Sequence, residues 1–208
     1  MRLGDKLRNE NKFHLFLLGL IILVTIWSAI NPFDAYMWRA NFMVAITYIV
    51  VFTLLYKHFR FTTMTVVLAF VHIFIVLLAA KYTYEEFPPF NWMRDSFSLG
   101  RNYFDRVGHL FQGVAPVMIF REIFLKGNYM KKSKFFIFTL LMFVLGTSGL
   151  WELLEFVGSN VAGKTDAYFV SMQGDMWDAQ WDMTMCLIGS IVSLLIFSKY
   201  QDKKMNID

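Results

Sequence analysis

The side chains best suited to chemistry are carboxylates and a histidine near one end of three apolar stretches in the C-terminal half of the chain. Asp105, His109 and Gln112 fall within about 60° of one another when residues are placed at 100° intervals around a helix. Glu152 and Glu155 are three residues apart and therefore share one helical face. A third face carries three aspartates at spacings of three and four, with tryptophans on the opposite side: Asp175, Asp178 and Asp182, against Trp177 and Trp181.

Several carboxylates that meet in a low-dielectric environment must be protonated, paired with arginine or bound to a cation. Oxygen and imidazole donors suit a divalent metal such as Mg, Mn, Zn or Fe. We expect this metal to be held by His109, Glu152, Asp178 and Asp182. Asp105 or Glu155 would then serve as general base. The remaining polar residues would contact the substrate, the two arginines by holding an anionic group: Arg101, Arg106, Gln112, Gln173 and Gln180.

Two other interpretations stay open at this point. Chains of Asp, Glu and His also mark ion or proton pathways, so the same carboxylates would suit a transporter or channel. Alternatively, Arg101 and Arg106 pair with the carboxylates and lock the helices of a non-catalytic scaffold. The other halves of the stretches look apolar, which disfavours transport, and Arg121 and Glu122 there are interpreted as a neighbouring pair at the membrane interface.

The composition places these residues in a membrane protein. The 208 residues are 57% hydrophobic and 17% charged, with a mean hydropathy of +0.46, whereas soluble domains carry about 25% charged residues. A soluble domain and a disordered chain are both excluded. Cys186 is the one cysteine, so no disulfide framework and no Cys-rich zinc site can form. The net charge is +4, but the positions of the charged residues follow a membrane topology, so we expect no nucleic-acid partner.

Six stretches are long and apolar enough, or nearly so, to cross a bilayer as helices. Their approximate bounds are 13–30, 38–56, 62–80, 103–125, 135–156 and 176–198. Fourteen of the 20 Lys and Arg residues lie at the two termini and in the links that share their side, and six lie on the other side. Positive residues are retained on the cytoplasmic side, so both termini are predicted to be cytoplasmic. The polar residues then lie at the external end, where a loop over 81–102 would form a lid or an interfacial segment.

Long and rare strings around these residues resemble bacterial inner-membrane proteins of the YjdF type, a family defined by a domain of unknown function. The two longest are Arg101-Asn102-Tyr103-Phe104-Asp105-Arg106-Val107-Gly108-His109 and Gln173-Gly174-Asp175-Met176-Trp177-Asp178-Ala179-Gln180-Trp181-Asp182-Met183. Shorter matches are Lys81-Tyr82-Thr83-Tyr84 with Pro88, Gln112-Gly113 with Pro116, Arg121-Glu122, and Glu152 with Glu155. The resemblance runs from Tyr82 into the last apolar stretch.

More distantly, the pattern is similar to VanZ-like membrane proteins, which carry Asp-x-x-x-His, an acidic-x-x-polar pair and Asp-x-x-x-Asn-x-x-Gly on successive helices. The matching pairs are Asp105 with His109, Glu152 with Glu155, and Asp182 with Gly189. Cys186 stands where Asn is expected, which favours a packing role for the small residues below Asp182. The two resemblances imply a cell-envelope role and a shared polar site, and they imply no substrate.

These observations predict an all-α bundle of six transmembrane helices that forms a single integral domain over 1–208 in the bacterial cytoplasmic (inner) membrane. The polar site would open at the outer headgroup level, so membrane lipids are the expected partners. The favoured activity is a metal-assisted hydrolase or transferase acting on a lipid or a lipid-linked substrate.

Overall fold

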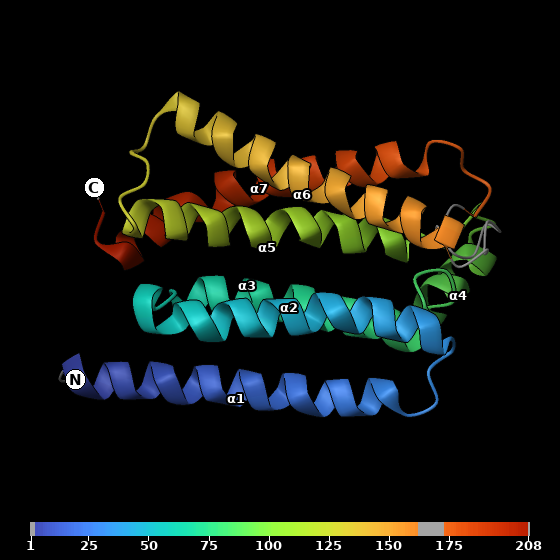
Figure 1. The fold of residues 1–208 in the computed structure, drawn as a ribbon, viewed down its shortest axis with the longest axis horizontal. Coiled ribbons are helices and arrows are strands. Elements are labelled where there is room, and N and C mark those ends of the chain that lie inside the picture. The colour runs from blue at the N-terminus through green and yellow to red at the C-terminus, as the bar shows by residue number, and fades with distance from the viewer. Residues whose placement is uncertain (1–2, 162–172, 208) are drawn as a thin grey trace.

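The computed structural model describes residues 3–161 and 173–207, which form helices joined by short links (Figure 1). The helices are α1 (Leu3–Ala29), α2 (Ala35–Phe59), α3 (Thr63–Tyr82), α4 (Pro88–Ser96), α5 (Phe104–Lys126), α6 (Lys134–Val161) and α7 (Asp178–Met205). The predicted all-α architecture is therefore confirmed for the described part of the chain. One of the six basic residues assigned to the external side, Lys164, lies outside the described residues.

Five of the described helices contain a stretch that is long and apolar enough to cross a membrane, and these are α1, α2, α3, α6 and α7. The sixth predicted span corresponds to α5, which has 23 residues but carries ionisable side chains near both ends. Most of these side chains are buried, so they face protein rather than lipid. That α5 crosses the membrane stays a prediction.

Local sequence explains where several helices begin. Asp34 caps α2 by accepting two backbone N–H groups of its first turn at 2.7 and 2.8 Å. Thr62 caps α3 in the same way. Pro88 and Pro89 occupy the first turn of α4, where the missing N–H of proline costs no helical hydrogen bond. The segment 81–102, which was predicted to be a loop, therefore contains a helix.

α5 and α7 pack on each other along their length. A β-carbon built on Gly113 would collide with the carbonyl oxygen of Cys186, and one built on Gly189 would collide with the carbonyl oxygen of Leu110. The two backbones therefore touch at the glycines, and a side chain at either position would separate the helices. The predicted close approach through small residues is confirmed.

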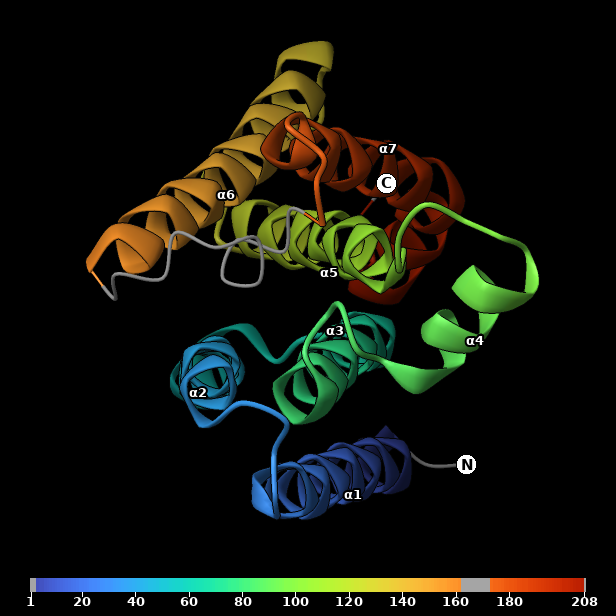
Figure 2. The ribbon, with the colours of Figure 1, turned by 90° about the vertical axis from the view of Figure 1, so that its right-hand side faces the viewer.

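The other helices surround this pair in layers, seen end-on in Figure 2. α6 packs against both α5 and α7, α3 packs against α5, and α2 and α1 both pack against α3. The two ends of the chain lie at the same end of the bundle (Figure 1), as an even number of crossings requires. We call this the terminal end and the opposite one the α4 end. Which end faces the cytoplasm stays a prediction.

Candidate functional site

Two of the expected metal ligands, His109 and Asp182, meet the expected general base Asp105 at the α4 end, between α5 and α7. Asp105, His109 and Asp182 each offer one ligand atom, and these atoms lie within 4.8 Å of one another. His109 Nε2 is 3.6 Å from Asp105 Oδ1 and 3.8 Å from Asp182 Oδ1. The spacing of four places Asp105 and His109 one above the other on α5, and Asp182 faces them from the start of α7. All three residues are buried.

Hydrogen bonding fixes the orientation of the His109 ring. Its Nδ1 lies 2.7 Å from Gln112 Oε1, an oxygen that also accepts a hydrogen bond from Ser148 Oγ at 3.4 Å. Because its partner is an acceptor, Nδ1 carries the proton, and the Nε2 lone pair faces Asp105 and Asp182. Metal-binding histidines typically donate their other ring N–H in this way. Three acceptor atoms therefore face one another, and a cation or a proton between them would relieve their repulsion.

Two arginines neutralise part of the aspartate charge. Arg106 donates to Asp182 Oδ1 at 2.5 Å and to Asp178 Oδ1 at 2.6 Å. Arg101 donates to the same Asp178 oxygen at 2.5 Å and lies 3.8 Å from Asp105 Oδ2. Asp178, expected from the sequence to bind a metal, is thus placed against two guanidinium groups. Asp105, expected to be a general base, is instead one of the three residues whose possible metal-ligand atoms converge.

Among the described residues of this region, carboxylates outnumber arginines. Asp175 also contacts both guanidinium groups, at 3.5 Å from Arg101 and 3.3 Å from Arg106. The full set of carboxylates is Asp105, Asp175, Asp178, Asp182, Glu152 and Glu155. Buried carboxylates that lack a matching positive charge must bind protons or a cation. The surplus is the charge that a divalent cation would compensate.

The two glutamates of α6 approach His109 from its Nδ1 side. Glu152 Oε1 lies 3.8 Å from His109 Nδ1. This oxygen is buried and has no hydrogen-bond partner among the described residues. Glu155 lies about one turn further along α6, on the same face as Glu152. Glu152, expected to be a metal ligand, is therefore beside the imidazole but away from the Nε2 atom that faces the aspartates.

The three glutamines take different positions. Gln112 holds the ring of His109. Gln173 accepts from the backbone N–H of Asn102 at 2.8 Å and donates to its carbonyl at 3.0 Å, so it ties the segment before α7 to the segment before α5. Gln180 is exposed on α7, away from the aspartates. The structure thus brings two of the three glutamines into the site region.

Asn102 is a positioning residue that the sequence analysis missed. It is fully buried, and its Oδ1 accepts the backbone N–H of Phe104 at the start of α5, at 2.9 Å. Its Nδ2 donates to Asn91 Oδ1 on α4 at 2.7 Å and to the carbonyl of Phe87 at 3.3 Å. An Asn just before a helix is a recognisable capping signal, but its link to α4 required knowing that α4 exists.

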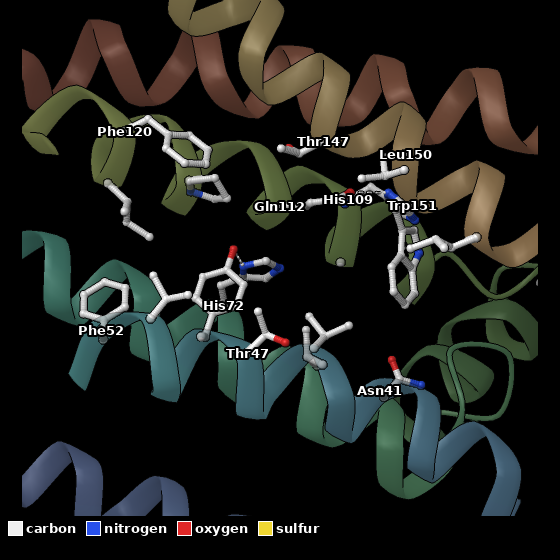
Figure 3. A pocket seen from close by; sticks show the side chains of 18 of the residues that line it. Asn41, Thr47, Phe52, His72, His109, Gln112, Phe120, Thr147, Leu150 and Trp151 are labelled. Atoms are coloured by element: carbon white, nitrogen blue, oxygen red, sulfur yellow. Dashed lines mark hydrogen bonds between the residues drawn. The ribbon is translucent and has the colours of Figure 1, made fainter. Parts of the chain in front are cut away.

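A cavity of about 370 Å³ lies beside the site, between α2, α5 and α6 (Figure 3). His109 and Gln112 form part of its wall. Tyr84, in the link before α4, lines the same end and packs on Gly108, where a β-carbon would lie 2.6 Å from the tyrosine ring. Burial, and then the nearby carboxylates led by Asp105, raise the pKa of Tyr84 well above its ordinary value. The phenol therefore stays neutral.

A second buried polar cluster lies at the terminal end of α5, in the half that was predicted to be apolar. Glu122 is fully buried and accepts hydrogen bonds from five donors: Thr62 N, Thr62 Oγ1, Thr65 Oγ1, Lys126 Nζ and Gln201 Nε2. Arg121 instead donates to Gln201 and Asp202, at 2.7 and 2.6 Å. The prediction of a neighbouring pair at the interface is wrong, because successive side chains point about 100° apart on a helix and each is buried against other helices.

These features define a class: a multi-pass α-helical membrane protein with a buried, carboxylate-rich polar site at one end of its bundle. The chain belongs to the family described as "Predicted membrane protein (DUF2238)", which matches residues 13–203. It is similar to the inner membrane protein YjdF of Escherichia coli (strain K12), with 26% identity over 185 residues that cover 89% of this chain and 88% of that protein. No solved structure matches. The resemblance to the YjdF type is confirmed, as is the multi-pass membrane location.

Proposed function

We propose that this protein is a metal-dependent hydrolase or transferase of the inner membrane, acting on a lipid or a lipid-linked substrate. The observation that carries the proposal is the convergence of acceptor atoms from Asp105, His109 and Asp182. Two carboxylates and one neutral imidazole suit Mn, Fe, Mg or Zn. The single imidazole favours a harder ion than Zn.

Asp105, His109 and Asp182 would hold the ion in this scheme. A bound divalent ion would supply polarisation of a phosphoryl or carbonyl oxygen of the substrate. Gln112 orients the imidazole by accepting from Nδ1. Arg106 orients Asp182 through its 2.5 Å hydrogen bond. Both arginines donate hydrogen bonds to aspartates, which supports a role in positioning these carboxylates.

Glu152 is the best-placed proton acceptor. Its Oε1 is buried without a hydrogen-bond partner among the described residues and lies 3.8 Å from His109 Nδ1. A carboxylate oxygen in this condition gains a hydrogen bond when a water or a substrate hydroxyl approaches, and it can then take the proton. Glu155, on the same face of α6, would place a second negative charge beside Glu152.

The location of the site supports a membrane-bound substrate. The cluster lies at one end of helices that are apolar enough to cross a membrane, and an adjoining cavity runs between those helices. A substrate with a polar group and a hydrocarbon part can reach such a site without leaving the bilayer.

Two buried histidines provide a matched test of the metal site. His109 and His72 are 5% and 4% exposed, but His72 is hydrogen-bonded to Tyr48 at 3.0 Å and belongs to no group of possible metal ligands among the described residues. We would purify the wild-type protein, His109→Ala and His72→Ala without chelators, add back each candidate ion, and measure metal by elemental analysis. We expect about one ion per chain in the wild type and His72→Ala, and none in His109→Ala.

A wild-type protein that retains none of the added ions would overturn the proposal, and so would equal loss of metal from both histidine variants. With metal established, the reaction class is tested on a bacterial lipid extract by following the release of phosphate, headgroup or fatty acid. Glu152→Gln is expected to keep its metal and lose the reaction. A lipid reaction that persists in His109→Ala would contradict the proposed site.

A further inference from the structure

The cavity beside the site is long and runs parallel to the helices. Its wall on α5 extends from Gly108 to Ile123, about 22 Å at about 1.5 Å per residue. Its wall on α2 extends from Asn41 to Phe52. The hydrocarbon core of a bilayer is about 30 Å thick, so the cavity, which we call the α2–α6 groove, follows the direction of lipid chains across much of one bilayer.

One side of the α2–α6 groove is open to the surroundings of the bundle. Val51 on α2 and Leu150 and Leu154 on α6 line the groove, yet they are 41%, 57% and 56% exposed. α2 packs on α3, and α6 packs on α5 and α7, so the α2–α6 boundary is not a packed one. Figure 2 shows α2 and α6 on the same flank of the bundle. Because α2 and α6 are both apolar enough to cross a membrane, we infer that the opening faces lipid.

The polar groups in the long wall are already bonded within the protein. Thr47 and Thr147 each donate to a backbone carbonyl in the preceding helical turn at 2.7 Å. His72 is bonded to the Tyr48 hydroxyl, and Figure 3 shows this bond inside the groove. A wall of this kind suits a hydrocarbon occupant, because a polar ligand would lose hydrogen bonds to water without regaining them here.

The two ends of the α2–α6 groove differ in polarity. Tyr84, His109 and Gln112 line the end near the carboxylates, whereas Phe52, Phe120 and Ile123 line the other. Glu152 Oε1, the buried oxygen without a hydrogen-bond partner among the described residues, does not line the groove but lies 3.8 Å from His109, which does. A ligand that matches this gradient has a polar group joined to a hydrocarbon chain.

We propose that the α2–α6 groove binds one hydrocarbon chain of a membrane lipid, inserted sideways between α2 and α6, with the polar part of the lipid at His109 and the chain end at Phe120. That this lipid is also the substrate rests on the proposed function, whereas chain binding does not. Lipid tails are as apolar as the groove, so transfer from bilayer to groove provides little driving force. The polar end therefore determines which lipid binds.

Photolabelling of the full-length protein in bilayer nanodiscs tests the placement and direction of the chain. Two phosphatidylglycerol probes carry a diazirine, one at the chain end and one at the first carbons of the chain. Mass spectrometry of the digested protein then maps the labelled residues. The chain-end probe is expected to label the walls around Phe52 and Phe120, and the other probe to label those around Tyr84 and Trp151.

Tryptophan substitutions on opposite walls should fill the groove. Figure 3 shows Thr47 on one wall and Leu150 on the other. Thr47→Trp and Leu150→Trp should abolish labelling at Phe120. The matched controls Met43→Trp and Leu153→Trp, on the same helices at side chains that are 61% and 62% exposed and do not line the groove, should preserve it.

The metal content of each variant separates this inference from the proposed function. Loss of groove labelling in Thr47→Trp with metal retained supports the groove independently of the metal. Labelling confined to outward side chains, insensitive to Thr47→Trp, overturns the groove and leaves the metal site standing. A reversed pattern, with the chain-end probe at Tyr84, also overturns it. Groove labelling in a protein that binds no metal overturns the proposed function alone.

Discussion

At the terminal end of α5, Glu122 receives five hydrogen bonds and pairs with Lys126, whereas at the α4 end four aspartates share two arginines, with two glutamates of α6 nearby. Both regions have a buried centre, and both include contacts between α5 and α7. Each of the five donor groups around Glu122 is hydrogen-bonded to one of its carboxylate oxygens. At the α4 end, acceptor atoms face each other across Asp105, His109 and Asp182, and one oxygen of Glu152 has no hydrogen-bond partner among the described residues.

The difference separates a structural cluster from a binding cluster. A buried polar group that is fully satisfied stabilises one arrangement of helices and has no capacity left for a ligand. A buried cluster with surplus acceptors is unstable by itself and becomes stable when something positive binds. Burial and charge, which the two regions share, do not distinguish them; the match between donors and acceptors does.

The largest effect is expected from Glu122→Ala. The substitution leaves the half-buried Lys126 and several buried donors without an acceptor, and unsatisfied buried donors of this number should together cost about 3–5 kcal/mol. The free energy of unfolding, measured by SDS titration in mixed micelles, should fall by this amount. Glu122→Gln, which keeps the shape and some of the hydrogen bonds, should lose less. A wild-type value for Glu122→Ala would show that the cluster is not structural.

Metal should stabilise the α4 end and leave the terminal end unaffected. A ligand that binds only the folded state at 100 times its Kd stabilises it by about 2.7 kcal/mol. The wild-type protein should therefore gain this much in the same unfolding assay when the ion is added, and His109→Ala should gain nothing. A gain of equal size in both proteins would mean that the ion binds elsewhere.

The substitution Gly113→Ala tests the close contact between α5 and α7, which lies between the two polar regions. A β-carbon there would meet the backbone oxygen of Cys186, so the helices must move apart, and overpacking of this kind typically costs about 1–3 kcal/mol. Gly146→Ala is the matched control, because nothing lies within 4 Å of a β-carbon built there. It should raise the unfolding free energy by about 0.5–1 kcal/mol through helix propensity. Opposite changes in the unfolding free energy of the two alanine variants would show that Gly113 is needed for close packing and that alanine does not destabilise the helices in general.

Asp105→Asn, like Glu122→Gln, replaces a carboxylate with an amide. It is expected to raise the unfolding free energy of the metal-free protein, whereas Glu122→Gln should lower the unfolding free energy. Asp105 lies 3.8 and 3.9 Å from the nearest arginine nitrogens and faces other carboxylates. Its neutralisation should stabilise the metal-free protein by about 1 kcal/mol and weaken metal binding. Unfolding with and without added ion measures both. Destabilisation of the metal-free protein would place Asp105 in a balanced ion pair.

The substitutions expected to perturb the fold least determine which side of the membrane each region faces. Cys186 is buried, so single cysteines introduced at exposed positions can be labelled selectively. Ser96→Cys, at the α4 end, should react in intact cells with a membrane-impermeant thiol reagent. Lys131→Cys, at the terminal end, should react only after permeabilisation. The reverse pattern would invert the predicted orientation.

The sequence predicted most of the fold because long apolar stretches and the distribution of positive charge both follow the bilayer. Asp105 and His109 were placed on one face by their spacing alone, and Gly189 was assigned to a close helix contact for its size. The sequence did not predict α4, whose nine residues are too short and too polar for a span. The cap at Pro88 and Pro89 was visible but was read as loop.

Partner choice within the polar regions could not be predicted. Asp178 and Asp182 share a helical face, but Asp178 meets both arginines and only Asp182 reaches His109. This difference in partners depends on the axial position of α7 relative to α5, which the local spacing of residues does not determine. Glu122 was misinterpreted for the same reason: apart from Lys126, its donors come from the start of α3 and from α7, far away in the sequence.

The backbone contact between α5 and α7 has a consequence for how the protein responds to bilayer thickness. Helices adapt to thinner or thicker membranes by tilting, and two helices in contact at Gly113 and Gly189 must tilt together. The distance between His109 and Asp182 then stays constant while the boundary between α2 and α6 adjusts. Metal affinity should therefore be the same in short-chain and long-chain lipids, and only the width of the lateral opening should follow the membrane.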